Sequence, residues 1–298
     1  MTNIVTVLTP VYNRKDKMKS LFLSLKKQTS DRFEWTIVDD GSTDGLKNVV
    51  EEFVKEAKFR INYLHKENGG KHTALNFGIK NTSTELTIIV DSDDYLTENA
   101  IEEIIAVHSK YHNNDVCGYS FLRQFSDGRI NGNMFSEDGI TDTYINMRIN
   151  ANDLYADKAE AYLTSCLKEF PFPEYDGEKF LGEDVVWIRM ARKYKMVHIN
   201  KPIYIGEYLE NGLTYNRRNN NIKSPMGCMA RASEFMKKDI QLKYRLKGTV
   251  QFIVYGKFAN LGNITIYKKS GHNKWTIVCF IPAMIITALW KWRLKTNY

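Results

Sequence analysis

The sequence has few cysteines and no targeting segment, and both absences restrict where the protein is expected to work. The four cysteines, Cys117, Cys166, Cys228 and Cys279, form no C-x-x-C pair and have no histidine at zinc-ligand spacing. We therefore expect reduced, buried thiols of a cytoplasmic protein. The N-terminus leads directly into an apolar strand, without the basic and apolar regions of a secretory signal, so export is not expected.

Low-complexity tracts and internal repeats are also lacking, which excludes disordered and repeat architectures. Hydrophobic residues make up 43% and charged residues 26% of the 298 residues, as in ordinary globular proteins. This length exceeds one average domain. We predict a main domain over residues 1–222 and a separate C-terminal region over residues 223–298.

Acidic residues are almost missing from the C-terminal end. From residue 237 onward there are twelve Lys or Arg residues and one acid, Asp239, a net charge of +11. The whole chain carries +7, so residues 1–236 carry −4. This asymmetry predicts a polyanionic partner for the tail, either anionic lipid headgroups or nucleic acid.

No apolar run is long enough to span a membrane. The longest, residues 275–290, has sixteen nearly continuous apolar residues, interrupted by Pro282 and flanked by Lys274 and Lys291. As a helix it would measure about 24 Å, short of the ~30 Å hydrocarbon core. We predict a membrane-associating interfacial segment over residues 275–292, and its Trp and Ile content favours lipid over nucleic acid. The alternative is a buried C-terminal helix.

The first 120 residues alternate strand and helix patterns. This repetition predicts an α/β fold, a Rossmann-like, mostly parallel sheet with helices on both faces. Residues 122–180 are less regular, and we predict one helix there, around 152–169, followed by another over 182–194. The predicted strands are 4–9, 33–38, 61–65, 86–90 and 115–121, and the predicted helices are 16–28, 44–57, 72–80 and 97–109.

Polar clusters follow four of these strands, at 9–13, 39–42, 68–71 and 91–94. Ligands of open α/β sheets bind beyond the carboxyl ends of the strands, so we expect these clusters to meet at one edge. Two of them are acidic and would repel each other unless a cation or hydrogen-bond donors neutralised them. Mg²⁺ or Mn²⁺ with a diphosphate would satisfy that need. The alternative is that the acids are helix caps and turn residues.

Five ordered motifs resemble glycosyltransferase family 2, which has the GT-A fold. They are TPVYNR (9–14), VDDGSTDG (38–45), ENGGKHTALNFGI (67–79), VDSDDYL (90–96) and GEDVVW (182–187), and the resemblance covers residues 3–215. It is specific because the order and spacing agree across all five. One departure is Ala74-Leu75-Asn76, where the family often has an Arg-Asn pair.

The resemblance implies a role for each site residue. Pro10 and Tyr12 would form a wall of the nucleotide-base pocket, and Asp40 would bond the base. Asn68 and Lys71 would lie near the base, ribose or diphosphate. Asp93 would bind Mn²⁺ or Mg²⁺ together with Asp91, which would also approach the ribose or the donor sugar, and Asp94 would support them.

The Glu183-Asp184 pair resembles the catalytic acids of the family, with Asp184 as the base. Inversion at the anomeric carbon needs a carboxylate opposite the leaving group, to take the proton of the acceptor hydroxyl. The alternative is that both acids complement the dipole of the helix that they begin. The segment 207–216, with Arg217 or Arg218 as phosphate clamps, could close over the diphosphate.

Together these features predict a metal-dependent, inverting glycosyltransferase. The expected donor is a nucleotide sugar, with UDP favoured, and the expected acceptor is a saccharide or a lipid-linked saccharide of bacterial capsule, exopolysaccharide or teichoic-acid synthesis. The protein would work peripherally at the cytoplasmic face of the membrane, without nucleic acid. Two alternatives remain open: a silent nucleotide-sugar-binding scaffold, and a nucleotidyltransferase, whose glycine-rich basic loop is missing after the first strand.

Overall fold

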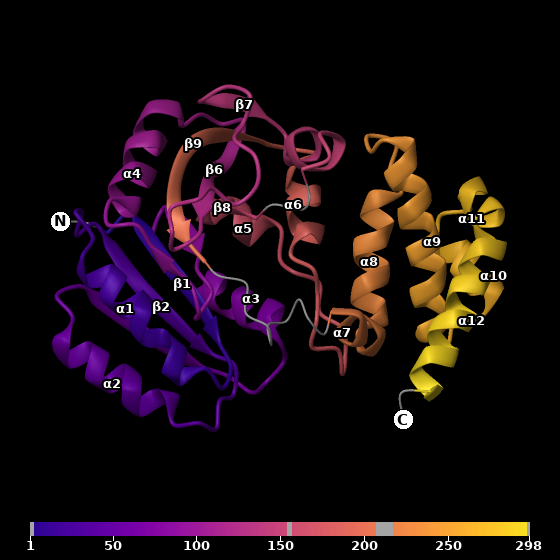
Figure 1. The fold of residues 1–298 in the computed structure, drawn as a ribbon, viewed down its shortest axis with the longest axis horizontal. Helices are drawn as coiled ribbons and strands as arrows, with labels where there is room; N and C mark the ends of the chain where they lie inside the picture. Colours follow the sequence, from indigo (N-terminus) through magenta and orange to yellow (C-terminus); the bar gives the residue numbers. More distant parts are fainter. Residues whose placement is uncertain (1–2, 154–156, 207–216, 297–298) are drawn as a thin grey trace. The chain divides into compact units, whose positions relative to one another are not determined.

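The computed structural model describes residues 3–153, 157–206 and 217–296, and the chain forms two compact units (Figure 1). Unit 1 contains Met1–Phe172 and Arg189–Glu210, and unit 2 contains Pro173–Ile188 and Asn211–Tyr298. The predicted division of the chain at residue 222 is a statement about function and stays a prediction.

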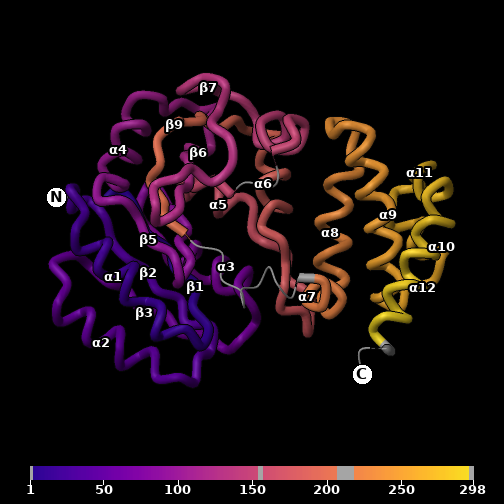
Figure 2. Tube along the Cα trace, in the orientation of Figure 1, coloured from indigo at the N-terminus to yellow at the C-terminus, as the bar shows by residue number. Residues whose placement is uncertain are grey.

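Four parallel strands form the first half of unit 1. They are β1 (Val5–Val11), β2 (Phe33–Asp39), β3 (Arg60–His65) and β4 (Leu86–Ile89), paired in the order β3-β2-β1-β4. Figure 2 labels the first three of these strands. Four of the five strands predicted from the sequence are confirmed here. Because β1 lies between β2 and β4, the strand order reverses at β1, which is where open α/β sheets bind their ligands.

Helices cover both faces of these strands, as expected. On one face α1 (Met18–Lys26) and α2 (Leu46–Glu56) meet, and the Phe22 ring stacks on Phe53 at 4.2 Å and on Trp35 of β2 at 6.3 Å. On the other face lies α3 (Lys71–Asn81), where a Cβ at Gly78 would come within 2.4 Å of Leu8 Cδ1. Gly78 therefore lets α3 approach the sheet closely.

The second half of the sheet corrects the prediction of a mostly parallel sheet. The full order is β3-β2-β1-β4-β8-β6-β9-β5, with β7 also paired to β9. β8 (Lys158–Leu163) is antiparallel to β4 and to β6 (Val116–Gln124), whereas β6 is parallel to β9 (Lys195–Ile205). β5 (Tyr95–Leu96) and β7 (Ile140–Asp142) are antiparallel to β9. The sheet is therefore mixed.

The predicted helix over 152–169 is wrong across β8 and correct only for α5 (Thr164–Glu169). The strand sequence KAEAYL consists mostly of good helix formers, which is why propensity favoured a helix. Its central position between β4 and β6 outweighs that preference. Gly118 of β6 permits the close pairing, since a Cβ there would lie 2.6 Å from the Ala161 carbonyl oxygen.

The remaining elements of unit 1 agree with the sequence in outline. α4 (Ala100–Tyr111) begins three residues later than predicted, and a π-helix, η2 (Ile145–Asn150), precedes β8. The predicted helix 182–194 is the shorter α6 (Asp184–Met190), which the division between the two units crosses. All four cysteines are free and buried, as expected.

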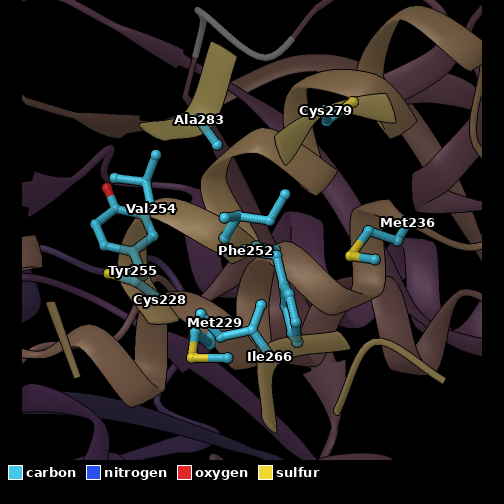
Figure 3. Close-up of a cluster of buried hydrophobic side chains, with 11 residues drawn as sticks. Cys228, Met229, Met236, Phe252, Val254, Tyr255, Ile266, Cys279 and Ala283 are labelled. Atoms are coloured by element: carbon cyan, nitrogen blue, oxygen red, sulfur yellow. The ribbon is translucent and has the colours of Figure 1, made fainter. Parts of the chain in front are cut away.

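Unit 2 is helical around its own core (Figure 3). That core joins Met229 and Met236, Phe252 and Tyr255, and Ala283. Within the described part of the chain, no helix is long and apolar enough to cross a membrane. The helices are α7 (Arg217–Lys223), α8 (Pro225–Phe235), α9 (Leu242–Phe258), α10 (Asn263–Lys269), α11 (Lys274–Val278) and α12 (Phe280–Thr296), which confirms the predicted helical C-terminal region.

Candidate functional site

The loops that follow the parallel strands converge at their carboxyl ends, as predicted. Asn13, after β1, donates its N–H to Ser42 Oγ at 3.0 Å and accepts the Thr43 N–H at 2.8 Å, which joins the loops after β1 and β2. Arg14 Nη1 lies 2.7 Å from Asp93 Oδ2, which joins the loops after β1 and β4. The sequence motifs on these loops therefore form one site.

Asp40 is the acceptor that organises the loop after β3. Its buried carboxylate accepts Lys66 Nζ at 2.8 Å and the Gly69 N–H at 3.0 Å on Oδ1, and Asn68 Nδ2 at 3.0 Å and the Gly70 N–H at 2.7 Å on Oδ2. A carboxylate offers about four acceptor positions, so the chain itself can fill them. A nucleotide base that bonded Asp40 would have to replace one of these donors.

Asp39, the preceding acid, holds the turn after β2. Its Oδ1 accepts the Ser42 N–H at 2.7 Å, and its Oδ2 accepts the Tyr63 hydroxyl at 2.5 Å. Burial, followed by the hydrogen bond to Asp39, raises the pKa of Tyr63 well above its usual value, so Tyr63 stays a donor. Asp39 is thus a turn residue, as in the alternative interpretation of the acidic clusters.

Asp91 faces Lys71 across the site, which brings together two of the predicted binding residues. Lys71 Nζ lies 2.6 Å from Asp91 Oδ1, and the Asp91 side chain is 38% exposed. Burial alone would raise the pKa of Asp91, but Lys71, Arg123 and Arg14 outweigh it, so that the pKa lies below the usual range. Asp91 is therefore ionised at neutral pH.

Asp93, the predicted metal ligand, is engaged by Arg14. Each acid of the cluster thus has a cation of the chain beside it, so the cluster does not require a metal for neutrality. In the described ranges no group of three or more His, Cys, Asp or Glu side chains is arranged to hold a metal ion. Mg²⁺ needs only one or two carboxylates when phosphates and waters supply the rest, so Asp91 and Asp93 fit such an ion if Arg14 gives way.

Asp94 is buried behind these two acids in a contact with Arg123 and Tyr204. Arg123 Nη2 lies 2.6 Å from Asp94 Oδ2, and Arg123 also lies over the Tyr204 ring at 3.9 Å. The Tyr204 hydroxyl donates to Asp94 Oδ2 at 2.7 Å and accepts the Asp91 N–H at 3.1 Å. Burial, opposed by Arg123, raises the pKa of Asp94 to about 6. The predicted supporting role of Asp94 stays a prediction.

Two of the predicted base-pocket residues lie on the loop side of β1. Tyr12 exposes 49% of its surface, and Pro10, at the end of β1, is half-buried. Asn68 donates to both the backbone carbonyl and the carboxylate of Asp40. An exposed aromatic ring next to a fixed polar loop is suited to stack a nucleotide base.

Asp184 is held by Arg231 within unit 2. Arg231 Nε lies 2.6 Å from Asp184 Oδ1, and Arg231 Nη2 lies 2.5 Å from Oδ2. Asp184 begins α6 and Arg231 lies on α8, so a helix-to-helix contact fixes the carboxylate. Glu183 precedes α6, and the predicted role of the pair stays a prediction. Residues 207–216, the predicted closing segment, lie outside the described residues, and Arg218 lies over the Trp290 ring at 5.2 Å.

Several side chains that hold the predicted acids in each unit were not predicted from the sequence. Arg14 belongs to the motif TPVYNR, which by itself indicates no role for this residue. Lys66, Arg123, Tyr204 and Arg231 lay outside the motifs. Tyr204 is 110 positions from Asp94, and Arg231 is 47 positions from Asp184, so only the folded chain brings these pairs together.

Comparison with families and curated proteins agrees with this arrangement. The family model described as Glycosyl transferase family 2 matches residues 6–163, more than half of the chain. Glycosyltransferase GlyA of Streptococcus pneumoniae is 27% identical over 208 residues, 67% of this chain and 30% of that protein. An uncharacterized glycosyltransferase of Rickettsia bellii is 34% identical over 140 residues, 44% of this chain and 20% of that protein. The chain thus spans less than a third of the length of either relative.

Solved structures share the fold. S. aureus TarS 1–349, solved also with UDP-GlcNAc, superposes with a TM-score of 0.62 at 22% identity, covering 85% of this chain and 71% of that one. Mannosyltransferase PcManGT from Pyrobaculum calidifontis, in complex with GDP-Man and Mn²⁺, gives a TM-score of 0.58 at 16% identity and covers 98% and 88%. At these identities the likeness establishes the fold.

Proposed function

The chain belongs to glycosyl transferase family 2, and on that basis we propose that it transfers a sugar from a nucleoside diphosphate donor to a saccharide acceptor with inversion. The observation that carries this proposal is the convergence of the four loops at the carboxyl ends of β1 to β4. These loops place an exposed ring, Tyr12, a fixed polar loop around Asp40, and the acids Asp91 and Asp93 at one edge.

The donor would bind across this edge. Its base, uracil by expectation, would stack on Tyr12 beside Pro10 and bond Asp40 or Asn68. Lys71 would pair with the diphosphate, since it already faces this side of the sheet in its contact with Asp91. Related structures were solved with UDP-GlcNAc and with GDP-Man, so a hexosyl or N-acetylhexosaminyl donor is proposed.

Asp93 and Asp91 would hold Mn²⁺ or Mg²⁺. When bound, such an ion offsets the negative charge on the leaving nucleoside diphosphate. Asp93 would have to leave Arg14 in order to hold the ion. Arg14 would then be available to pair with a phosphate oxygen, an acceptor that suits its guanidinium group.

Asp184 would act as the base that accepts the proton of the acceptor hydroxyl, with Glu183 beside it. Arg231 would hold its carboxylate in one orientation through hydrogen bonds from both Nε and Nη2. A carboxylate that accepts two or three hydrogen bonds keeps a lone pair for a further one, so this contact is compatible with proton transfer. Orientation of the reacting group is itself worth a large part of an enzymatic acceleration.

The acceptor would be a saccharide carried on a lipid, in the synthesis of a bacterial cell-surface polysaccharide at the cytoplasmic face of the membrane. The supporting observations are the charge of +11 from residue 237 onward and the relatives in bacteria, including the protein described as putative glycosyltransferase EpsH of Bacillus subtilis, 31% identical over 120 residues. The basic tail would meet anionic lipid and not nucleic acid.

Donor turnover tests the proposal directly. The purified protein is mixed with UDP-, GDP- and TDP-sugars, with and without Mn²⁺ or Mg²⁺, and nucleoside diphosphate release is followed. We expect metal-dependent turnover of one donor. Asp93→Ala should lose donor binding, and Asp184→Asn should bind the donor but turn it over about 10²- to 10⁴-fold more slowly, the usual contribution of a general base.

A matched control is Asp127→Asn, which removes an exposed acid that pairs with Arg129 in a loop of unit 1. It should retain full turnover. Binding of a donor without turnover of any would favour the silent scaffold, whereas no metal-dependent binding of any nucleotide sugar would refute the proposal.

A further inference from the structure

Helix α12 and the residue before it, Cys279, pack against the other helices of unit 2 along one side only. Cys279 and Ala283 belong to the core that α9 provides (Figure 3), and Thr287, one turn further, is also buried. The Trp290 ring meets Tyr255 at 6.2 Å. The spacing of four, four and three residues places all four on one face of a helix. For this face, the alternative of a buried C-terminal helix is thus correct, whereas the predicted interfacial segment stays a prediction.

The opposite face of α11 and α12 is apolar and exposed to water. We name it the outer row: Ile277, Val278, Ile281, Ile285, Leu289 and Trp292, which are 52–72% exposed. From Ile281 onward its members recur at intervals of four, four and three, so they too form one face. Single exposed apolar residues are ordinary, but a continuous row marks an interaction surface.

Cations surround the outer row. Lys274 begins α11, and Lys291 and Arg293 flank Trp292 in the sequence, so that at 100° per residue they lie on either side of the row. Two further lysines, Lys268 and Lys269, end α10. After Asp239 the sequence contains no acid at all.

We propose that the outer row is a docking surface for an anionic lipid bilayer, on which α12 lies in the plane of the interface. Apolar side chains with a tryptophan at the end and lysines at the sides match the two layers of a membrane surface, acyl chains below anionic headgroups. The other face of α12 is buried in the core of unit 2, so only the outer row of this helix can contact lipid.

Charge argues for lipid over a second copy of the chain. Two copies that met through the outer row would bring together two regions of +11, and like charges at an interface oppose association. Anionic headgroups, in contrast, attract each lysine near the surface. This inference rests on the proposed function, in which the basic tail meets anionic lipid. The two can fail separately, because vesicle binding needs no donor and donor turnover needs no vesicle.

Vesicle flotation tests the surface. The full chain is mixed with vesicles of phosphatidylcholine alone or with phosphatidylglycerol added, at low and high salt. We expect flotation with the anionic vesicles, weakened but not abolished by salt because the apolar contact remains. The variant Ile281→Gln/Ile285→Gln should reduce the partition coefficient about tenfold or more, since two apolar side chains no longer enter the interface.

The matched control is Leu23→Gln/Val54→Gln, which removes two exposed apolar side chains, 45% and 53% exposed, from α1 and α2 of unit 1. It should float as the unmodified chain does, and the thermal unfolding of both variants should match that of the unmodified chain. Equal flotation of the Ile281/Ile285 variant would overturn the proposal. So would a failure of the unmodified chain to bind anionic vesicles, or the conversion of a stable dimer to monomer by the same substitutions.

Discussion

Arg231 contacts both oxygens of the Asp184 carboxylate, with Nε 2.6 Å from Oδ1 and Nη2 2.5 Å from Oδ2. Two-point pairing of this kind fixes the plane of the carboxylate as well as its position. The proposed base is therefore oriented by a side chain of a different helix. Both side chains are mostly buried, so solvent weakens the pair less than it weakens a surface ion pair.

Loss of this contact should slow catalysis without weakening donor binding. In Arg231→Gln the Asp184 carboxylate loses its second hydrogen bond and turns more freely, so we expect kcat to fall about tenfold or more while donor affinity stays unchanged. Arg231→Lys should restore charge but not orientation, and its kcat should stay low. Turnover and calorimetric donor binding of both variants measure this. Equal loss of donor affinity in both variants would indicate a structural role instead.

A second expectation concerns Arg14, which competes for the proposed metal ligand. In Arg14→Gln the ion pair with Asp93 is lost, and Mn²⁺ should bind more tightly in the absence of donor, by about twofold to fivefold, the equivalent of a partly exposed ion pair. Titration with Mn²⁺ followed by electron paramagnetic resonance measures this affinity. Lys47→Gln removes an exposed charge elsewhere and should change nothing; the same gain in Lys47→Gln would show a general effect of net charge.

The parallel half of the fold and the site loops could be predicted from the sequence because the signal is local. Each strand ends in its own motif, and parallel strands place those ends at one edge. β8 was missed because its helix-forming residues become a strand only between β4 and β6. The buried and the exposed face of α12 could not be distinguished from the sequence either, since apolar residues lie all around the helix and show no helical periodicity.

The partners of the acids could not be predicted for a different reason. Lys66 and Arg123 are ordinary basic residues in the sequence, and only the sheet brings them to Asp40 and Asp94. The expectation that a cation or hydrogen-bond donors neutralise the acidic clusters did not identify Lys66 and Arg123 as the groups beside Asp40 and Asp94. Local motifs thus identified the acids, whereas the packing of distant segments determined what holds them.

Tyr204 supports the Asp91 loop, and removal of its hydroxyl should weaken donor binding. In Tyr204→Phe the Asp91 N–H and the Asp94 carboxylate each lose a partner, which should cost about 1–3 kcal/mol of unfolding free energy. Urea unfolding and donor titration measure the two effects. The matched control is Tyr119→Phe, which removes a buried hydroxyl bonded to His108 Nδ1 at 2.8 Å. It should lower stability only; equal loss of donor affinity in the control would contradict a role for Tyr204 in the site.

Acid should destabilise the protein through His198, which is fully buried in β9 between the Phe135 ring and the Asp142 carbonyl oxygen. Burial, with a contribution from Arg148 and Lys158 and against Asp142, lowers the pKa of His198 to about 4. The unfolded chain, with a histidine pKa of about 6.5, therefore binds more protons between pH 6.5 and 4. Stability is fully present above this window and falls as the pH falls through it, by about 3 kcal/mol.

Urea unfolding at pH 7 and at pH 4.5 measures this loss of unfolding free energy. The loss should be smaller in His198→Gln than in the unmodified chain, whereas His65→Gln, at the exposed end of β3, should lose as much as the unmodified chain does. An unchanged pH dependence in His198→Gln would assign the acid sensitivity to the carboxylates instead.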